Sequence, residues 1–166
     1  MTSEISVLLD ALHARLTATN QTVSVAESCT GGLLGATLTE LPGSSRYFLG
    51  GIQAYANEVK AALLGVRHET LVSFGAVSEE VASEMARGVQ RLTGSDWAIS
   101  TTGVAGPDGG SGEKPVGTVW ISVVGFDGVF SQKLTLDGDR RSVRQGSVSG
   151  ALSMLLERLS GGDSTL

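Results

Sequence analysis

The chain has 166 residues, 41 % of them hydrophobic, and carries 12 Lys and Arg against 17 Asp and Glu, a formal net charge of −5. This length suits one domain with a core, and the acidic balance argues against a general nucleic-acid binder, which needs a basic face. One Cys and two His exclude a disulfide framework and a Cys/His zinc cluster, so we expect no metal. The acidic start is unlike a signal peptide and no apolar run reaches ~20 residues, so we expect a cytoplasmic protein without a membrane partner.

The first half of the chain predicts alternating helices and strands. Residues with helical spacing begin it, namely Ile5, Leu8, Leu9, Leu12 and Leu16. Pro42-Gly43 ends a second helix, and Asn57 is the expected N-cap of a third, which Gly65 ends. In chain order we predict a helix over 5–16, a strand over 22–26, a helix over 33–41, a strand over 47–55 and a helix over 58–64.

The second half predicts a clear helix, a hairpin and a final helix. Ser78 is the expected N-cap of a helix that Gly94 ends, and its core-facing residues are Val81, Met85, Val89 and Leu92. A strand follows over 97–101, and strands over 116–124 and 129–136 form a hairpin around Asp127-Gly128. Asp139 is expected to cap the last helix, whose core-facing residues are Val148, Leu152, Leu155, Leu156 and Leu159, before a frayed end over 160–166. We therefore expect one domain over 1–166, an α/β sandwich with a mixed sheet.

A Gly-rich turn, Ser28-Cys-Thr-Gly-Gly32, lies between a predicted strand and a predicted helix. Backbone N–H groups at such a turn stabilise anions, either a phosphate or the oxyanion of an acyl-transfer intermediate. The Ser28 hydroxyl would then be placed as a nucleophile, although the G-x-S-x-G spacing is absent. The alternative is that Ser28 or Thr30 only caps the helix that follows.

Three further side chains are candidates for chemistry beside Ser28. Cys29 is a competing nucleophile, but a lone Cys beside a strand end is more often a small buried hydrophobe, and no His is placed to activate it. Lys60 is a candidate base, provided that burial lowers its pKa toward neutrality, and the Tyr55 hydroxyl could relay a proton. The alternative is a solvated helix lysine and a strand-end aromatic.

Two segments in the second half of the chain suit an anionic ligand. The stretch 103–117 is long for a connector, and its glycines with Lys114 suit the wrapping of a phosphorylated ligand, unless it is only a mobile connector. Arg140, Arg141 and Arg144 lie in the first turns of the last helix, where cations oppose the helix dipole, so we expect them to bind an anion. The alternative for these arginines is a solvated basic face.

Several motifs occur together in one order over most of the chain. They are Ala26-Glu-Ser-Cys-Thr-Gly-Gly32, Tyr55-Ala-Asn-Glu-Val-Lys60, Leu64-Gly-Val66, Gly75-Ala-Val-Ser78, Thr102-Gly-Val-Ala-Gly-Pro-Asp-Gly-Gly110, Lys114-Pro-Val-Gly117 and Gly138-Asp-Arg140 with Val143-Arg144. In this order they resemble the CinA C-terminal domain family, also called nicotinamide mononucleotide deamidases. The resemblance implies a single-domain α/β/α sandwich. It also implies an enzyme that hydrolyses the carboxamide of nicotinamide mononucleotide to nicotinate mononucleotide and ammonia, with no cofactor.

The resemblance also implies roles for individual residues. Ser28 corresponds to the nucleophile of the family, Lys60 to its base and Tyr55 to its third catalytic residue. Arg140 is expected to recognise the substrate phosphate, and N–H groups around Thr30–Gly32 are expected to hold the oxyanion. The expected substrate-binding residues are Thr30, Gly31, Gly32, Thr102, Gly103 and Arg140. Family members are often dimers, so a homodimer is the expected assembly.

Two alternatives compete with the amidase hypothesis. A Ser-Tyr-Lys set and the run Thr30-Gly-Gly-Leu-Leu-Gly35 also resemble a short-chain dehydrogenase, but Tyr55 and Lys60 are five positions apart where that family has four. The other alternative is a non-catalytic domain of the CinA type that binds nucleotides or regulates. Release of ammonia from nicotinamide mononucleotide separates both alternatives from the amidase hypothesis.

Overall fold

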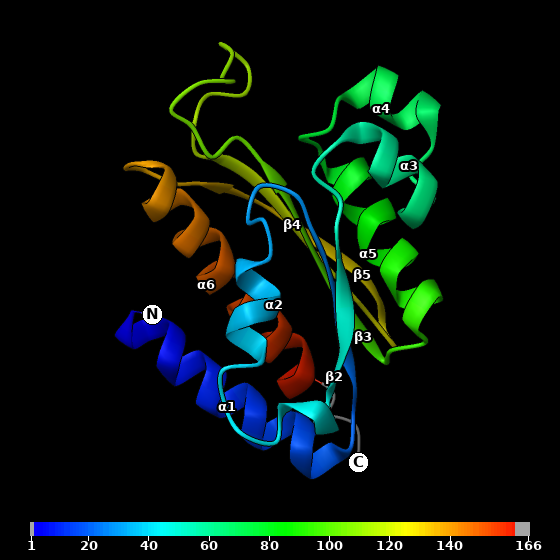
Figure 1. Cartoon of the computed structure of the whole chain (residues 1–166), viewed down its shortest axis with the longest axis vertical. Helices are drawn as coiled ribbons and strands as arrows, with labels where there is room; N and C mark the ends of the chain where they lie inside the picture. The colour runs from blue at the N-terminus through cyan, green and yellow to red at the C-terminus, as the bar shows by residue number, and fades with distance from the viewer. Residues whose placement is uncertain (1, 162–166) are drawn as a thin grey trace.

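The computed structural model describes residues 2–161, which fold into an open sheet with helices on both faces. In chain order the elements are α1 (Ser3–Thr19), β1 (Val23–Glu27), α2 (Leu33–Leu38), the 3₁₀ turn η1 (Ser44–Arg46), β2 (Phe48–Gln53), α3 (Asn57–Leu64), α4 (His68–Phe74), α5 (Glu79–Thr93), β3 (Trp97–Gly103), β4 (Thr118–Gly125), β5 (Gly128–Thr135) and α6 (Arg140–Gly161). Figure 1 shows α1, α2 and α6 on one face of the sheet and α3, α4 and α5 on the other. The predicted α/β/α sandwich is confirmed.

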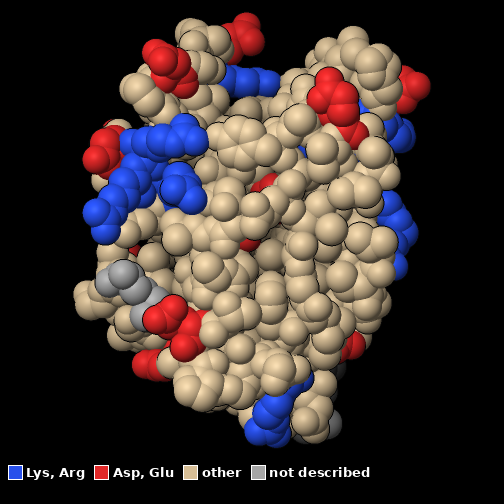
Figure 2. All heavy atoms as spheres, viewed as in Figure 1, with Lys and Arg blue, Asp and Glu red and all other residues tan. Residues whose placement is uncertain are grey.

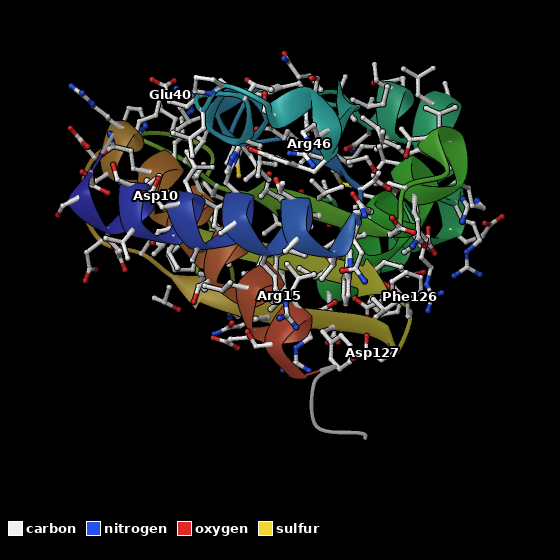
Figure 3. All side chains as sticks on the ribbon, turned by 90° about the horizontal axis from the view of Figure 1, so that it is seen from below. Asp10, Arg15, Glu40, Arg46, Phe126 and Asp127 are labelled. Carbon is white, nitrogen blue, oxygen red and sulfur yellow. The ribbon has the colours of Figure 1, made fainter. Side chains whose placement is uncertain are left out.

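The sheet has five strands in the order β2-β1-β3-β4-β5. β1 pairs in parallel with β2 and β3, whereas β4 is antiparallel to both β3 and β5, so the sheet is mixed as predicted. Gly125 pairs with Gly128, which leaves Phe126 and Asp127 as the two-residue turn of the predicted hairpin (Figure 3). Parallel pairing brings the carboxyl ends of β1, β2 and β3 to one edge of the sheet, the upper edge in Figure 1.

The main core lies between the sheet and the pair α1 and α6, which confirms the predicted apolar faces of these helices. Its buried side chains include Leu9, Leu12, Leu16, Val148, Leu152 and Leu155. The two helices are also joined by Arg15, whose Nη2 donates to the Leu159 carbonyl at 3.0 Å (Figure 3). A smaller cluster packs α5 against the other face of the sheet through Val81, Met85 and Val89.

Capping residues mark the starts of the two helices that were predicted in the second half of the chain. The Ser78 hydroxyl accepts the Val81 N–H and begins α5, and Gly94 ends it in the left-handed region at φ 71°. Asp139 Oδ1 accepts the Ser142 N–H at 2.8 Å at the start of α6. Both predicted N-caps are therefore confirmed.

Several predictions differ from the structure at the level of single residues. Asn57 is not an N-cap, because α3 already begins there and Ala56 precedes it without a side-chain cap. Leu92 is exposed rather than buried, because the last turn of α5 has left the packed interior. The helix predicted over 33–41 ends at Leu38, and of the predicted frayed end, 160 and 161 are helical while 162–166 lie outside the described residues.

Helix α4 was not predicted at all. It spans only seven residues, and Thr70 is the one residue of it that is buried. A helix this short with a mostly exposed surface carries no apolar repeat that a sequence pattern could reveal.

Candidate active site

The carboxyl ends of β1 and β3 place the predicted nucleophile at the upper edge of the sheet. Ser28 directly follows the last residue of β1, and its N–H donates to the Thr101 carbonyl of β3 at 2.9 Å. Ligand sites of open α/β sheets lie outside such carboxyl ends. Figure 2 shows this end of the molecule as a notch between two projections, which Figure 1 identifies as the 103–117 loop and the α3–α4 segment.

Lys60 comes to Ser28 from α3. Its Nζ donates to Ser28 Oγ at 3.1 Å and to the Tyr55 carbonyl oxygen at 3.1 Å. Ser28 is 8 % exposed and Lys60 only 1 %. The fold thus joins two predicted residues that lie 32 positions apart in the chain, and the alternative of a solvated helix lysine is wrong.

Burial lowers the pKa of the Lys60 ammonium below its usual value, because a desolvated cation loses the hydration that stabilises its charge. The neighbouring Cys29 and Glu58 act in the opposite direction, with the smaller effect. Within the described part of the chain, Lys60 forms no ion pair that would restore the lost stabilisation. The neutral amine, which is the form that can accept a proton, is therefore reached at a lower pH than for a free lysine.

Cys29 is placed as a structural residue. The side chain is 4 % exposed and packs in the main core. Burial raises the pKa of its thiol to about 11, so the thiolate that a nucleophile requires is disfavoured. The interpretation of Cys29 as a small buried hydrophobe is the one that this environment supports.

Tyr55 lies at the edge of the site and not between Ser28 and Lys60. Its side chain is 59 % exposed, and its hydroxyl accepts a hydrogen bond from Arg140 Nη2 at 2.8 Å. Only the carbonyl of Tyr55 contacts Lys60, so in this geometry the base reaches the nucleophile directly and the phenol relays no proton. The catalytic role of the Tyr55 hydroxyl stays a prediction.

Two of the predicted oxyanion donors are already occupied. The Gly31 N–H donates to the carbonyl three residues before it at 3.0 Å, and the Gly32 N–H donates to Glu27 Oε2 at 3.1 Å. That part of the prediction is wrong for this structure, because both donors are used inside the turn. Among residues 2–161, the N–H groups of Cys29 and Thr30 donate to no other residue, and they are the donors of this turn that remain for an oxyanion.

Glu27, the last residue of β1, is the site residue that sequence reasoning missed. Its Oε2 accepts the N–H groups of Gly32 and Leu34, and its Oε1 accepts that of Gly35 at 2.8 Å. The available signal was an acid directly before a Gly-rich turn and a helix start, where backbone N–H groups attract negative charge. The dehydrogenase alternative is wrong for the same reason, since these N–H groups bind an internal carboxylate where a dinucleotide would place its pyrophosphate.

Three predicted substrate-binding residues contact neighbouring residues of the protein. The Thr30 hydroxyl lies 2.7 Å from the Thr101 hydroxyl, and the Thr102 hydroxyl donates to the Ala76 carbonyl at 2.7 Å. Gly103 lies against β4, where an added Cβ would come within 2.7 Å of a carbonyl oxygen. These residues shape the wall of the site, and their direct contact with a substrate stays a prediction.

The long loop over 103–117 is attached at both sides of the notch by cations. Arg140 Nη1 donates to the Gly106 carbonyl at 2.8 Å, and Lys114 Nζ donates to the Phe74 carbonyl at the end of α4 at 2.6 Å. Arg144 turns inward, where its Nη2 donates to the Thr30 carbonyl at 2.6 Å. Figure 2 shows Lys and Arg side chains gathered beside the notch, where α6 begins in Figure 1.

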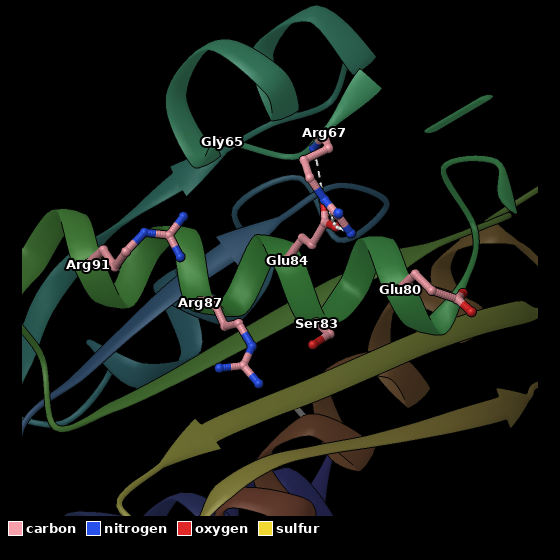
Figure 4. A pocket seen from close by; sticks show the side chains of 7 residues that line it. All are labelled: Gly65, Arg67, Glu80, Ser83, Glu84, Arg87 and Arg91. Carbon is pink, nitrogen blue, oxygen red and sulfur yellow. Dashed lines mark hydrogen bonds and ion pairs between the residues drawn. The ribbon is translucent and has the colours of Figure 1, made fainter. Parts of the chain in front are cut away.

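A cavity of about 510 Å³ elsewhere on the surface does not include the Ser28–Lys60 pair (Figure 4). It lies between α5 and the α3–α4 turn, and the Arg67–Glu84 ion pair at 2.7 Å joins these two segments within it. Its lining residues are Gly65, Arg67, Glu80, Ser83, Glu84, Arg87 and Arg91.

The described residues offer neither a cluster of metal-ligating side chains nor a membrane-spanning helix. No group of three or more His, Cys, Asp and Glu side chains gathers within residues 2–161 where it could hold a metal ion. Of the helices that the structure describes, none combines the length and the apolar character that crossing a membrane requires.

Comparison with known families and structures shows which family the chain belongs to. Residues 6–159 match the model of the CinA C-terminal domain. The chain belongs to the CinA C-terminal domain family. Its structure superposes with a TM-score of 0.93 on the crystal structure of the competence/damage inducible protein CihA from Agrobacterium tumefaciens, at 40 % identity over 96 % of this chain and 98 % of that chain.

Curated CinA-like proteins are longer than this CinA-family domain. The CinA-like protein of Gloeothece citriformis is 56 % identical over 142 residues, which cover 84 % of this chain and 34 % of that protein. The CinA-like protein of Leptospira biflexa is 48 % identical over 151 residues, or 90 % of this chain and 36 % of that protein. The chain thus spans about a third of the length of these curated relatives. Their names state no chemical reaction.

Proposed function

We propose that this CinA-family domain is an amidohydrolase that converts nicotinamide mononucleotide to nicotinate mononucleotide and ammonia. The observation that carries the proposal is the contact of 3.1 Å between Lys60 Nζ and Ser28 Oγ, with both side chains buried. Burial of a lysine without an ion pair costs stability, and a lysine beside a serine hydroxyl is a known base–nucleophile pair of acyl transfer. The identity of the substrate follows from the family resemblance of the motifs.

Ser28 and Lys60 can carry both halves of such a reaction. Neutral Lys60 accepts the Ser28 proton while Oγ attacks the carboxamide carbon, and the Cys29 and Thr30 N–H groups stabilise the oxyanion. As the C–N bond breaks, the Lys60 ammonium donates its proton to the leaving amine, which departs as ammonia and leaves an ester on Ser28. Lys60 then deprotonates a water that hydrolyses the ester, which yields nicotinate mononucleotide and restores both residues.

In this proposal Arg140 recognises the phosphate of the substrate. Its side chain is exposed beside the notch, and its two terminal nitrogens contact neutral acceptors, the Tyr55 hydroxyl and the Gly106 carbonyl. A phosphate is a stronger acceptor than either of these groups, because hydrogen bonds to an ionised partner are roughly twice as strong as neutral ones. Arg144 is less available, since two of its nitrogens already donate to the Thr30 carbonyl.

Ammonia release from nicotinamide mononucleotide tests the proposal. We expect the wild type to release ammonia and Ser28→Ala to release none, with the fold retained because only one hydroxyl contact to Lys60 is lost. Cys29→Ala is the matched control, and its rate should stay within several-fold of the wild type.

The opposite pattern, with an inactive Cys29→Ala and an active Ser28→Ala, would make the thiol the nucleophile. A wild type that binds the mononucleotide without releasing ammonia would instead support the non-catalytic nucleotide-binding alternative.

A further inference from the structure

Glu27 is a buried carboxylate with no part in the proposed chemistry. It is 1 % exposed, and it forms no ion pair with any residue in the described chain. Its two oxygens accept three backbone N–H groups, at 3.1, 3.0 and 2.8 Å. Such hydrogen bonds stabilise a buried charge without a cation, and breaking them would leave it uncompensated.

These three bonds determine the shape of the chain that carries the nucleophile. They run from Glu27 to N–H groups five, seven and eight residues downstream, so they close the backbone around the Ser28–Gly32 turn. Gly32 adopts φ 95°, and a Cβ on Gly35 would lie 3.3 Å from Glu27 Oε1. The absence of a side chain at Gly35 thus leaves room for the carboxylate.

The turn is held from its other side by Arg144. Its Nε and Nη2 donate to the Thr30 carbonyl at 3.2 and 2.6 Å, while Glu27 holds the N–H groups that follow. The turn held in this way carries Ser28, whose Oγ lies 3.1 Å from Lys60 Nζ, and the N–H groups of Cys29 and Thr30.

We propose that Glu27 is a positioning residue: its carboxylate holds the Ser28–Gly32 turn in the one conformation in which the hydroxyl, the base and the oxyanion donors face the same point. The proposal rests on Ser28 being the nucleophile of the proposed function. It predicts that loss of the carboxylate lowers the rate of the Ser28 chemistry and leaves substrate binding at the exposed residues nearly unchanged.

The surface near Glu27 permits a chemical-rescue experiment. A cavity of about 230 Å³ is lined by Glu27, Gly32, Gly35 and Gln53, among others, so a small carboxylate can reach the space that Glu27→Ala would open. We expect Glu27→Ala to lower kcat about 100-fold, the effect of a misplaced reacting group, with KM within a few-fold of the wild type. Acetate should raise kcat of that variant toward the wild-type value, and sodium chloride at equal ionic strength should leave it unchanged.

Covalent labelling of Ser28 by a fluorophosphonate, measured by mass spectrometry, gives a readout that needs no nucleotide substrate. The labelling rate should fall with kcat in Glu27→Ala and recover with acetate. Glu27→Gln provides a second variant of nearly the same shape, should Glu27→Ala fail to fold. Its amide has one acceptor oxygen for three N–H donors, so we expect slow labelling here as well. Glu84→Ala is the control. It removes a carboxylate of α5 that also accepts a backbone N–H, that of Arg67, and it should be labelled at the wild-type rate.

Labelling of Glu27→Gln at the wild-type rate would overturn the proposal. So would a folded Glu27→Ala that is labelled at the wild-type rate, or one whose lost rate acetate does not restore. A wild type that is labelled at Ser28 but does not hydrolyse nicotinamide mononucleotide would overturn the proposed function alone.

Discussion

The floor of the site and its rim are built from different contacts. We define the floor as Glu27, Ser28 and Lys60, and the rim as Tyr55, Arg140 and the loop over 103–117. Each floor residue is 8 % exposed or less, whereas the Tyr55 side chain is 59 % exposed. Floor residues have exchanged hydration for contacts with one another and with the backbone, while the rim side chains keep contact with water.

This difference in exposure separates proton transfer, which suits the floor, from anion binding, which suits the rim. In the buried floor little water is left to screen a charge, and burial lowers the pKa of Lys60. On the rim, an exposed arginine keeps its charge and attracts an anion without changing the reacting atoms. Variants of the floor should therefore change kcat, and variants of the rim should change KM.

Among the variants that compare the floor with the rim, Lys60→Arg should lower kcat the most. A guanidinium keeps the charge of the floor but does not deprotonate near neutral pH, so we expect a loss of at least about 1,000-fold in kcat. Wild-type activity should rise as the pH climbs through the lowered pKa of Lys60, because only the neutral amine accepts the Ser28 proton. A pH series of ammonia release measures both effects. Substantial activity of Lys60→Arg would show that charge alone suffices, and the base assignment would have to be abandoned.

Two glycine substitutions compare the turn that carries Ser28 of the floor with the loop of the rim. Gly32 adopts φ 95°, and a Cβ there would lie 2.5 Å from Gln53 Nε2, so Gly32→Ala strains the turn that carries Ser28. Strain of this kind costs about 1–3 kcal/mol, and we expect a lower melting temperature and a roughly tenfold lower kcat. Gly112 in the rim loop has nothing within 4 Å of the equivalent position, so Gly112→Ala should match the wild type in both measurements. Equal effects of the two variants would remove the distinction between floor and rim.

Arg140→Ala should act on substrate binding and leave the chemical step nearly unchanged. We expect KM for nicotinamide mononucleotide to rise about tenfold, the worth of one charge-assisted contact, with kcat nearly unchanged. Hydrolysis of free nicotinamide, which lacks the phosphate, is the control substrate and should be insensitive to this change. Equal losses on both substrates would assign Arg140 to the structure of the rim, through its contacts with Tyr55 and Gly106.

The parts of the fold that local signals describe were predicted well. The N-caps Ser78 and Asp139 and the hairpin all depend on residues within a few positions of one another, although the turn itself lies at Phe126-Asp127, one position before the predicted Asp127-Gly128. The strand order and helix α4 could not be predicted, because the first depends on pairing between distant segments and the second has no apolar repeat.

The site divides in the same way. Ser28, Lys60 and Tyr55 could be named from the motifs, but their relation could not, and the Tyr55 hydroxyl lies against Arg140 instead of Lys60. Glu27 was missed because its partners are backbone N–H groups, which every residue but proline carries, so the acid before the Gly-rich turn was the one local signal of its role.

The sequence by itself determined the fold class, the element boundaries near strong caps and the residue types available for acyl transfer, because periodicity, caps and side-chain chemistry are properties of neighbouring residues. Only the tertiary structure decided that Lys60 loses its hydration beside Ser28, that Cys29 stays a buried thiol and that Glu27 fills the Gly-rich turn. Desolvation and hydrogen-bond partners depend on what packs around a group, and here those neighbours come from strands and helices far apart in the chain.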